Sequence, residues 1–272
     1  MDEVRQGLQY IFQTDSPYTL CISGTGHAGM EAALVNLLEP GETVLVGNKG
    51  IWGARAADMA ERLGANVVEI KVEAGKSFSY EQLKGAVEQH KPAVLFLCQG
   101  DSSTGVHQSL AGLGDLCHAN GTLLLVDTVC SLGGVPFFAD AWGIDAIYTG
   151  SQKCLSAPPG AAPLFLSDRA LAKVRGRKTK VRSYYLDLNL VGDYWGWYNS
   201  RSYHHTGMVS AGWVLRCHNQ GRGCTGGLEA AMHEGDASLH SALLWVCSWL
   251  PGLCQKRRPL LKLAPGFPGA RY

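Results

Sequence analysis

Residues 93–127, AVLFLCQGDSSTGVHQSLAGLGDLCHANGTLLLVD, decide the fold class of this chain. Two uninterrupted apolar runs, 93–97 and 122–126, flank a polar connection and a segment at 110–118 with a helical pattern. A strand that is covered on one face alternates apolar and polar residues, whereas a continuous apolar run indicates cover on both faces. The stretch therefore predicts two buried strands joined by a helix.

The same alternation continues on both sides of this stretch. We expect further strands at 18–22, 43–46, 66–70, 146–148 and 163–166, and helices at 26–38, 53–63 and 80–89. Strands that alternate with helices form a largely parallel sheet with flanking helices, which places the chain in the α/β class. We find no internal repeat.

Composition excludes several classes of partner. The 272 residues hold 24 Lys and Arg against 23 Asp and Glu, a formal net charge of +1. Proteins that bind nucleic acids or acidic membranes carry a strong basic excess, so we expect neither partner. No apolar run reaches the ~18 residues of a transmembrane helix. The start, residues 1–4, has no apolar leader, and we interpret the nine cysteines, without a CxxC pair, as reduced intracellular thiols.

The composition changes near residue 207. Residues 207–272 hold 7 Lys and Arg against 3 Asp and Glu, together with four of the nine cysteines and several glycine-rich stretches. We find no alternation of strands and helices there. We therefore expect one domain at 1–206 and a poorly ordered tail at 207–272.

Polar residues follow five of the predicted strands at the point where each strand ends. In an open α/β sheet, ligands bind outside the carboxyl ends of the strands, so we expect these side chains to converge. The five segments are SGTGH at 23–27, GNKGIW at 47–52, QGDSSTG at 99–105, Asp127, and TGSQK at 149–153.

The glycine-rich loop after the first strand matches the pattern G-x-G-x-x-G at residues 24–29. A dinucleotide-binding unit would need an acidic residue about 20 positions on, at the end of the next strand. That strand is followed by Gly47-Asn48-Lys49, with no acid. A helix N-terminus that faces a phosphate remains as the functional interpretation, and an ordinary glycine-rich helix start is its alternative.

Three further side chains each have a functional and a plain interpretation. Asp127 ends a buried strand, so it either has a positive partner such as a protonated ring nitrogen or forms a cap or a bond to the next loop. Lys153 is a solvated surface charge or a desolvated amine that forms a Schiff base with an aldehyde. Trp52 stacks on a ring or packs in the core. Together, a phosphate loop, a stacking aromatic, a carboxylate and a reactive lysine describe pyridoxal 5′-phosphate.

The ordered series of motifs from residue 23 to residue 206 resembles the class V, fold-type I pyridoxal-phosphate enzymes of the alanine–glyoxylate (serine–pyruvate) aminotransferase family. The motifs are SGTGH at 23–27, IWG at 51–53, DSSTG at 101–105, LVD at 125–127, GSQK at 150–153 and YHHT at 203–206. The resemblance implies that Lys153 binds the cofactor covalently, that Asp127 pairs with its ring nitrogen and that Trp52 stacks on the ring. It further implies contacts to the phenolic-oxygen side from Ser102, to the phosphate from Gly26, His27 and Gln152, and to the phosphate of the second subunit of a homodimer from Tyr203 and Thr206.

The resemblance also sets expectations about the extent of the chain. Residues 1–206 would form an incomplete pyridoxal-phosphate-binding large domain. The family's N-terminal segment, which wraps the partner subunit, and its small C-terminal domain, which carries the arginine for the substrate carboxylate, would be missing. Arg216, Arg222 and Arg271 have no supporting motif. The compartment would be the peroxisome or mitochondrion by resemblance, and the cytoplasm if the chain is taken literally, since we find no targeting signal.

The implied activity is transamination, with alanine or serine as amino donor and glyoxylate or pyruvate as acceptor, so that glyoxylate is detoxified to glycine. Two alternatives stay open. One is a truncated form without activity that at most binds the cofactor. The other is a different fold-type I enzyme such as a cysteine desulfurase, which would need a catalytic cysteine. We expect no metal site, because the adjacent His204 and His205 on an extended segment should point apart.

Overall fold

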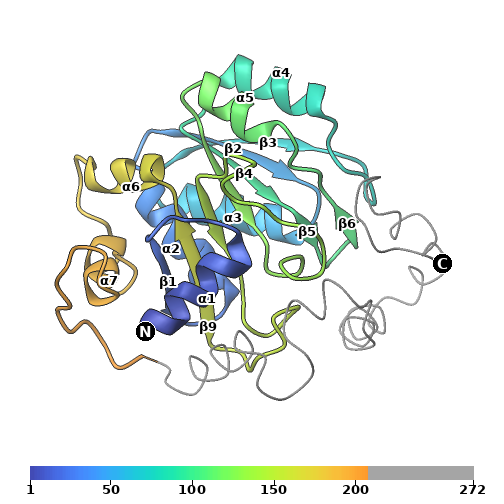
Figure 1. Cartoon of the computed structure of the whole chain (residues 1–272). Helices are drawn as coiled ribbons and strands as arrows, with labels where there is room; N and C mark the ends of the chain where they lie inside the picture. Colours follow the sequence, from blue (N-terminus) through green and yellow to red (C-terminus); the bar gives the residue numbers. More distant parts are fainter. Residues whose placement is uncertain (208–272) are drawn as a thin grey trace, which may run out of the picture.

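The computed structural model describes residues 1–207, so the expected tail at 207–272 lies outside it except for its first residue. The centre of the molecule is a seven-stranded sheet with the order β1-β9-β8-β7-β4-β2-β3 (Figure 1). Its strands are β1 (Thr19–Ser23), β2 (Thr43–Asn48), β3 (Asn66–Lys71), β4 (Val94–Cys98), β7 (Leu123–Asp127), β8 (Ala146–Tyr148) and β9 (Ala161–Leu166). A separate hairpin consists of β5 (Gly100–Asp101) and β6 (Val106–His107).

All neighbouring strands of the large sheet run parallel except β9, which is antiparallel to both β1 and β8. The mostly parallel α/β sheet predicted from the apolar runs is confirmed. The reversal of β9 was not predicted, because a continuous apolar run carries no information on strand direction. Since β9 lies between them, β1 and β8 run the same way. The carboxyl ends of β1, β2, β4, β7 and β8 therefore share one edge of the sheet.

Helices cover both faces of the sheet, which explains why β4 and β7 are buried along their whole length. Helices α2 and α3 contact each other below the sheet, and α4 and α5 contact each other above it (Figure 1). The helices are α1 (Asp2–Phe12), α2 (Gly26–Leu37), α3 (Ile51–Arg62), α4 (Tyr80–His90), α5 (Leu113–Ala119), α6 (Asp168–Arg175) and α7 (Leu188–Tyr194). At the edge of the sheet, β3 is the most exposed strand.

The helices α1, α6 and α7 and the β5–β6 hairpin were not predicted from the sequence. Helix α6 follows Ser167 and α7 follows Asp187, and each of these side chains accepts a hydrogen bond from a backbone N–H of the first turn. Such capping bonds satisfy N–H groups that have no partner within the helix. The helix predicted at 110–118 begins only at Leu113, because Gly112 before it adopts a left-handed φ of 74°.

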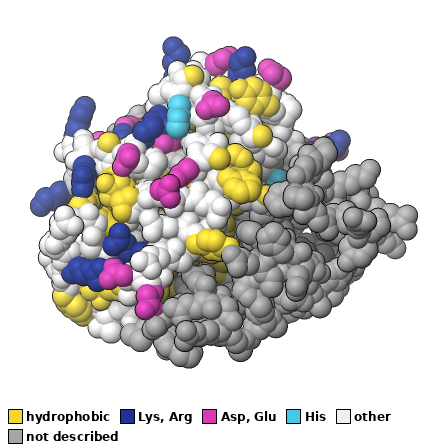
Figure 2. Space-filling view, in the orientation of Figure 1, with side chains coloured by type: hydrophobic (Ala, Val, Ile, Leu, Met, Phe, Trp, Pro, Cys, Tyr) yellow, Lys and Arg dark blue, Asp and Glu magenta, His cyan; other side chains and the backbone are white. Residues whose placement is uncertain are grey.

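The described surface carries mixed charges. Cationic and anionic side chains are interspersed over the face shown in Figure 2, as the small net charge implies. Tyr184 and Tyr203 are the most exposed large apolar side chains, at 72% and 73%. In the part of the chain that the structure describes, every helix is too short or too polar to cross a bilayer.

Candidate active site

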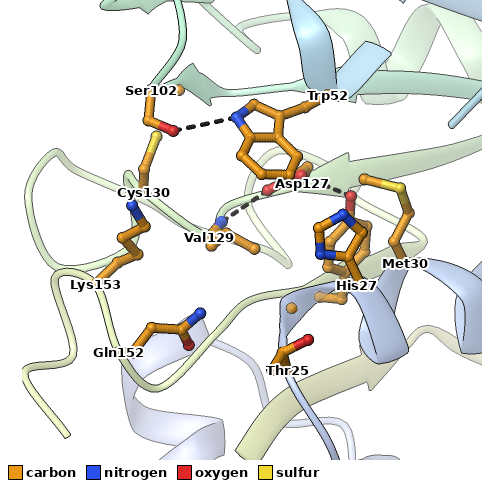
Figure 3. A pocket seen from close by; sticks show the side chains of 13 residues that line it. Thr25, His27, Met30, Trp52, Ser102, Asp127, Val129, Cys130, Gln152 and Lys153 are labelled. Carbon is orange, nitrogen blue, oxygen red and sulfur yellow. Dashed lines mark hydrogen bonds between the residues drawn. The ribbon is translucent and has the colours of Figure 1, made fainter. Parts of the chain in front are cut away.

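A cavity of about 360 Å³ lies at the carboxyl edge of the sheet, where the polar segments converge (Figure 3). Its walls come from the first turns of α2 and α3, the end of β7 and the loop after β8. Seven of the nine site residues predicted from the sequence line this cavity: Gly26, His27, Trp52, Ser102, Asp127, Gln152 and Lys153. The other two, Tyr203 and Thr206, do not. The lining is completed by Thr25, Met30, Gly100, Val129, Cys130 and Tyr148, which sequence reasoning did not single out.

Asp127 is the last residue of β7, and only 3% of it is exposed. Its carboxylate accepts hydrogen bonds from the Tyr148 hydroxyl at 2.6 Å and from the Val129 backbone N–H at 2.8 Å. The bond to the next loop that the sequence left open is therefore made by one of its oxygens. Burial raises the pKa of Asp127 to about 6, and the two hydrogen bonds oppose this shift. A carboxylate desolvated in this way would be stabilised by a cationic partner.

Tyr148 places its hydroxyl on Asp127 because the two residues are register partners on the parallel strands β7 and β8. The side chain is fully buried, and burial together with the adjacent carboxylate raises the pKa of the phenol well above its ordinary value. The phenol therefore stays protonated and donates to Asp127. In the sequence, Tyr148 is the last residue of an apolar strand and not one of the polar residues that follow it. The alignment of the two predicted strand ends was the signal that could have found it.

Lys153 lies in the loop that connects β8 to β9 and is half-buried at the cavity (Figure 3). Among residues 1–207, its Nζ makes neither a hydrogen bond nor an ion pair. The loop that carries it is anchored by Ser151, whose hydroxyl donates to the Pro158 carbonyl at 2.6 Å and whose carbonyl accepts from the Ala157 N–H at 2.8 Å. A fixed loop thus presents an amine without a partner to the same cavity as Asp127.

Trp52 is held by contacts on two sides. Its indole N–H donates to the Ser102 hydroxyl at 3.1 Å, and its ring meets the His27 ring edge-on, with centroids 5.3 Å apart. Ser102 belongs to the turn of the β5–β6 hairpin, so the hairpin fixes the indole from the far side of the cavity. The ring is half-buried and lines the cavity, which leaves it accessible to a flat ligand.

The glycine-rich loop ends at the first turn of α2, with Thr25 as the residue before the helix. The Thr25 side chain makes no capping bond, and the first backbone N–H groups of any helix lack partners within the helix. A Cβ added at Gly26 would lie 2.9 Å from a methyl group of Val129, so the glycine permits the close approach of this turn to the loop after β7. The turn therefore offers hydrogen-bond donors to an anion in the cavity.

Gln152 completes the wall beside Lys153. Its amide oxygen is buried without a hydrogen-bond partner among the described residues, and Figure 3 shows its amide nitrogen pointing toward the centre of the cavity. A buried amide that lacks partners is destabilising unless a bound molecule or water completes its bonds. The amide is thus a further group that a ligand can satisfy.

Tyr203 and Thr206 do not line the cavity, and their hydroxyl groups hydrogen-bond to each other at 3.1 Å. The expectation that His204 and His205 point apart was wrong. Their Nδ1 atoms lie 2.7 Å apart, because the His204 ring stacks on Tyr184 at 5.2 Å while the His205 Nε2 contacts the Ser23 hydroxyl at 2.7 Å. In the described part of the chain, no group of three or more His, Cys, Asp or Glu residues is placed to bind a metal ion.

Comparison with known proteins places this site in a family. The Aminotransferase class-V family matches residues 1–215. The chain belongs to the class-V aminotransferases. An alanine–glyoxylate aminotransferase of Drosophila melanogaster is 52% identical over 208 residues, which are 76% of this chain and 53% of that protein. An alanine–glyoxylate aminotransferase of Rattus norvegicus is 51% identical over 217 residues, which are 79% of this chain and 52% of that protein.

A solved structure resembles this class-V aminotransferase along most of its length. The crystal structure of an alanine–glyoxylate aminotransferase from Nostoc sp. superimposes with a TM-score of 0.78 at 46% identity and covers 90% of this chain and 61% of that chain. The fold-type I large-domain architecture expected from the sequence is thereby confirmed. This class-V aminotransferase spans about half the length of the curated relatives it matches.

Class-V aminotransferases are enzymes that depend on pyridoxal 5′-phosphate, and the cavity residues fit this group. The cofactor is an aromatic aldehyde with a basic ring nitrogen and a phosphate. Asp127 offers a desolvated carboxylate to the ring nitrogen, and Lys153 offers an amine without a partner to the aldehyde. The first turn of α2 and the amide N–H of Gln152, which points toward the cavity in Figure 3, offer hydrogen-bond donors to the phosphate. The glycine pattern at 24–29 therefore has no need of the dinucleotide interpretation.

Proposed function

We propose that this chain binds pyridoxal 5′-phosphate and serves transamination, with alanine or serine as amino donor and glyoxylate or pyruvate as acceptor. One observation carries the proposal: Asp127 and Lys153, on neighbouring strand ends, line one cavity. Relatives that are about 50% identical in sequence are named as alanine–glyoxylate aminotransferases, which supports this choice of substrates. The net reaction would convert glyoxylate to glycine. A location in the peroxisome or the mitochondrion stays a prediction from the resemblance.

The residues at the cavity would divide the cofactor between them. Lys153 would bind it covalently, Asp127 would hold the ring nitrogen, Trp52 would cover the ring, Ser102 would contact the phenolic-oxygen side, and Gly26, His27 and Gln152 would hold the phosphate. When bound, the cofactor supplies an electron sink that makes the α-hydrogen of an amino acid acidic.

The chain's own groups supply the proton chemistry. With a pKa of about 6, the Asp127 carboxyl is mostly ionised at neutral pH, so it can accept a hydrogen bond from a protonated ring nitrogen. A cation at that position would lower the pKa of Asp127 below this raised value. Lys153 is placed to act as a general base at Nζ, because no described side chain occupies its nitrogen and the loop behind it is anchored. Tyr148 keeps the carboxylate oriented.

The cysteine-desulfurase alternative is disfavoured by the state of the cavity thiol. Cys130 lines the cavity, but burial raises its pKa to about 12, with the nearby Asp127 carboxylate acting in the same direction. A nucleophilic thiol needs the opposite shift, since the thiolate is the reactive form.

A second candidate function is a cofactor-binding chain without transaminase activity. No arginine lines the cavity within residues 1–207, so the described part of the chain offers no planar cation for a substrate carboxylate. Such a chain would bind pyridoxal 5′-phosphate at the same site but would not catalyse transamination.

We also propose that the chain forms a homodimer. Tyr203 and Thr206 lie away from the cavity of their own chain, and Tyr203 is among the most exposed aromatic residues. They could therefore reach the phosphate site of a second copy. Gel filtration of the full chain with light scattering tests this: a dimer is expected, and a monomer that binds the cofactor normally contradicts it.

Absorption spectroscopy of the full chain separates these functions. Adding pyridoxal 5′-phosphate should produce a protein-bound visible band, and alanine should bleach it, with glyoxylate restoring it. A band that alanine leaves unchanged favours the inactive candidate. Absence of any band in the folded chain overturns the assignment of Lys153 and Asp127.

A further inference from the structure

His27 contacts an arginine that sequence reasoning did not consider. Arg55 lies one turn after Trp52 on α3, and its Nη1 is 2.6 Å from the His27 Nε2. Its guanidinium carbon lies 4.9 Å from the centroid of the Trp52 ring, which itself contacts the His27 ring. Cation–π contact with Trp52 thus restrains the arginine that touches the histidine. Two cavity-lining aromatic side chains and one exposed cation form a single unit between the first turns of α2 and α3.

The chemistry of this contact determines where the histidine proton lies. A guanidinium group has five N–H donors and no acceptor, and it keeps its charge at all accessible pH values. The His27 Nε2 must therefore accept, so the ring is neutral and its proton is on Nδ1. Partial burial and then the positive charge of Arg55 lower the pKa of His27, which agrees with a neutral ring.

The remaining nitrogen of the ring has a free donor. Nδ1 of His27 has no hydrogen-bond partner within residues 1–207, and the residue lines the cavity beside the first turn of α2. An Nδ1–H at this place adds a side-chain donor to the backbone donors of the turn. The other titratable groups that face the cavity are Asp127 from β7, Cys130 from the loop after β7, Tyr148 from β8 and Lys153 from the loop after β8. From α3, only Arg55 faces His27.

We propose that Arg55 is a positioning residue that fixes His27 as the neutral Nδ1–H tautomer, so that this N–H is presented to the phosphate of the cofactor. The role of the phosphate rests on the function proposed above, whereas the tautomer does not. Without Arg55, the neutral ring distributes its proton between both nitrogens, and protonation of the ring becomes easier because the neighbouring positive charge is gone.

Nitrogen NMR of the full chain with labelled histidine tests the tautomer in the absence of cofactor. The His27 signal is assigned from its loss in His27→Asn. In the wild type, Nε2 should carry no proton from about pH 6 to about pH 8, and in Arg55→Met the signals should move to mixed tautomers with a higher pKa. Arg62→Met is the matched control on the same helix, since among residues 1–207 the Arg62 guanidinium pairs only with the exposed Asp58. A protonated Nε2 in the wild type, or identical signals in Arg55→Met, overturns the proposal.

Binding of pyridoxamine 5′-phosphate tests the consequence, because this probe carries the phosphate without condensing with Lys153. Quenching of tryptophan fluorescence gives its affinity. We expect Arg55→Met to weaken binding about two- to fivefold at about pH 8, because only part of the neutral rings then donates from Nδ1. The loss should be smaller at about pH 6, where a protonated His27 can donate from either nitrogen. The control Arg62→Met shows how much the affinity for the probe changes between these pH values because the phosphate itself titrates.

Two further variants separate orientation from plain charge and from misfolding. In a His27→Asn background, whose amide N–H replaces Nδ1–H, Arg55→Met should have a much smaller effect on affinity. If Arg55 acts only through its charge, the effect persists in that background, and the proposal fails. If Arg55→Met does not fold, Arg55→Lys takes its place. Because lysine keeps a donor, this variant should show part of the wild-type pH dependence of binding. If the wild type itself does not bind the probe while the NMR result holds, the proposed cofactor function fails and the tautomer assignment stands.

Discussion

The two walls of the cavity are built in different ways. On the β7–β8 wall, strand register sets the contact between Asp127 and Tyr148, and both side chains are almost completely buried. On the α2–α3 wall, His27, Trp52 and Arg55 are held by side-chain contacts between two helix termini and remain partly exposed. The first wall places charge where water cannot screen it, and the second presents adjustable donors and a flat ring. Substitutions should therefore act strongly and through pH on the first wall, and moderately and through affinity on the second.

Lys153→Ala should have the largest effect, because it removes the amine that the loop after β8 presents to the cavity next to the buried wall. We expect loss of the visible cofactor band and a fall in transamination of at least about a thousandfold, since both the covalent anchor and the general base are absent. Stopped-flow absorption with alanine measures it. Lys180→Ala, at an exposed lysine away from the cavity, is the control. A Lys153→Ala protein that retains the band contradicts the assignment.

Asp127→Asn should separate stability from function. In the cofactor-free chain, burial raises the carboxyl pKa from its ordinary value to about 6, so the folded state binds the proton more tightly than the unfolded state. Stability is therefore lost as the pH rises between about 4 and about 6, by about 2–3 kcal/mol. Asp127→Asn should remove this loss and be the more stable protein at about pH 7 but not at about pH 4, while cofactor affinity falls. Urea unfolding at both pH values measures it, and an equal difference at both would count against the buried charge.

Tyr148→Phe should destabilise the chain by about 1–3 kcal/mol, because it leaves a buried carboxylate oxygen without its donor. It should also raise the pKa of Asp127 further, since the hydrogen bond from Tyr148 lowers that pKa in the wild type. Chemical unfolding and the pH dependence of cofactor binding measure the two effects. Tyr184→Phe, at a highly exposed tyrosine, is the control and should change neither. Equal behaviour of the two variants would show that register does not set this wall.

Trp52→Phe should have the smallest effect of the series. Phenylalanine keeps a flat ring but loses the 3.1 Å bond to Ser102, so we expect a loss of about 0.5–1.5 kcal/mol in cofactor affinity with little change in its pH dependence. Ser102→Ala should cost a similar amount, and the double variant should cost less than the sum, because both remove the same bond. Strict additivity would mean that the hairpin does not hold the indole.

The sequence was informative about the sheet because its central strands are buried on both faces. The continuous runs at 93–97 and 122–126 mark β4 and β7, and the polar residues after them mark the cavity. The direction of β9 was not encoded in its apolar pattern. Helix α1 was not predicted, although its buried residues recur at helical spacing from Val4 to Phe12. It precedes the first strand and therefore lies outside the alternation of strands and helices that indicated the other elements.

The site residues show the same division. Asp127 could be predicted because a carboxylate at the end of a buried strand is unusual. Lys153 could be predicted only together with it, from the shared sheet edge, since a single lysine in a loop is ordinary. Tyr148 could not be found without aligning two strand ends, and Arg55 could not be found at all, because an exposed arginine on a helix is ordinary until its partner from another helix is known. The pattern of residues within one segment does not reveal contacts with elements far away in the chain.

The reversed strand β9 has a consequence for how the molecule is made. In the described chain, β1 pairs only with β9, which is synthesised about 140 residues later, and Gly24 is bonded to Gly160 across the same junction. A nascent chain that has emerged as far as β8 can already assemble the Asp127 wall, while the glycine-rich loop has no strand to dock on. The phosphate-facing half should therefore close last during translation, and this long delay leaves an unpaired strand open to chaperones or to wrong partners.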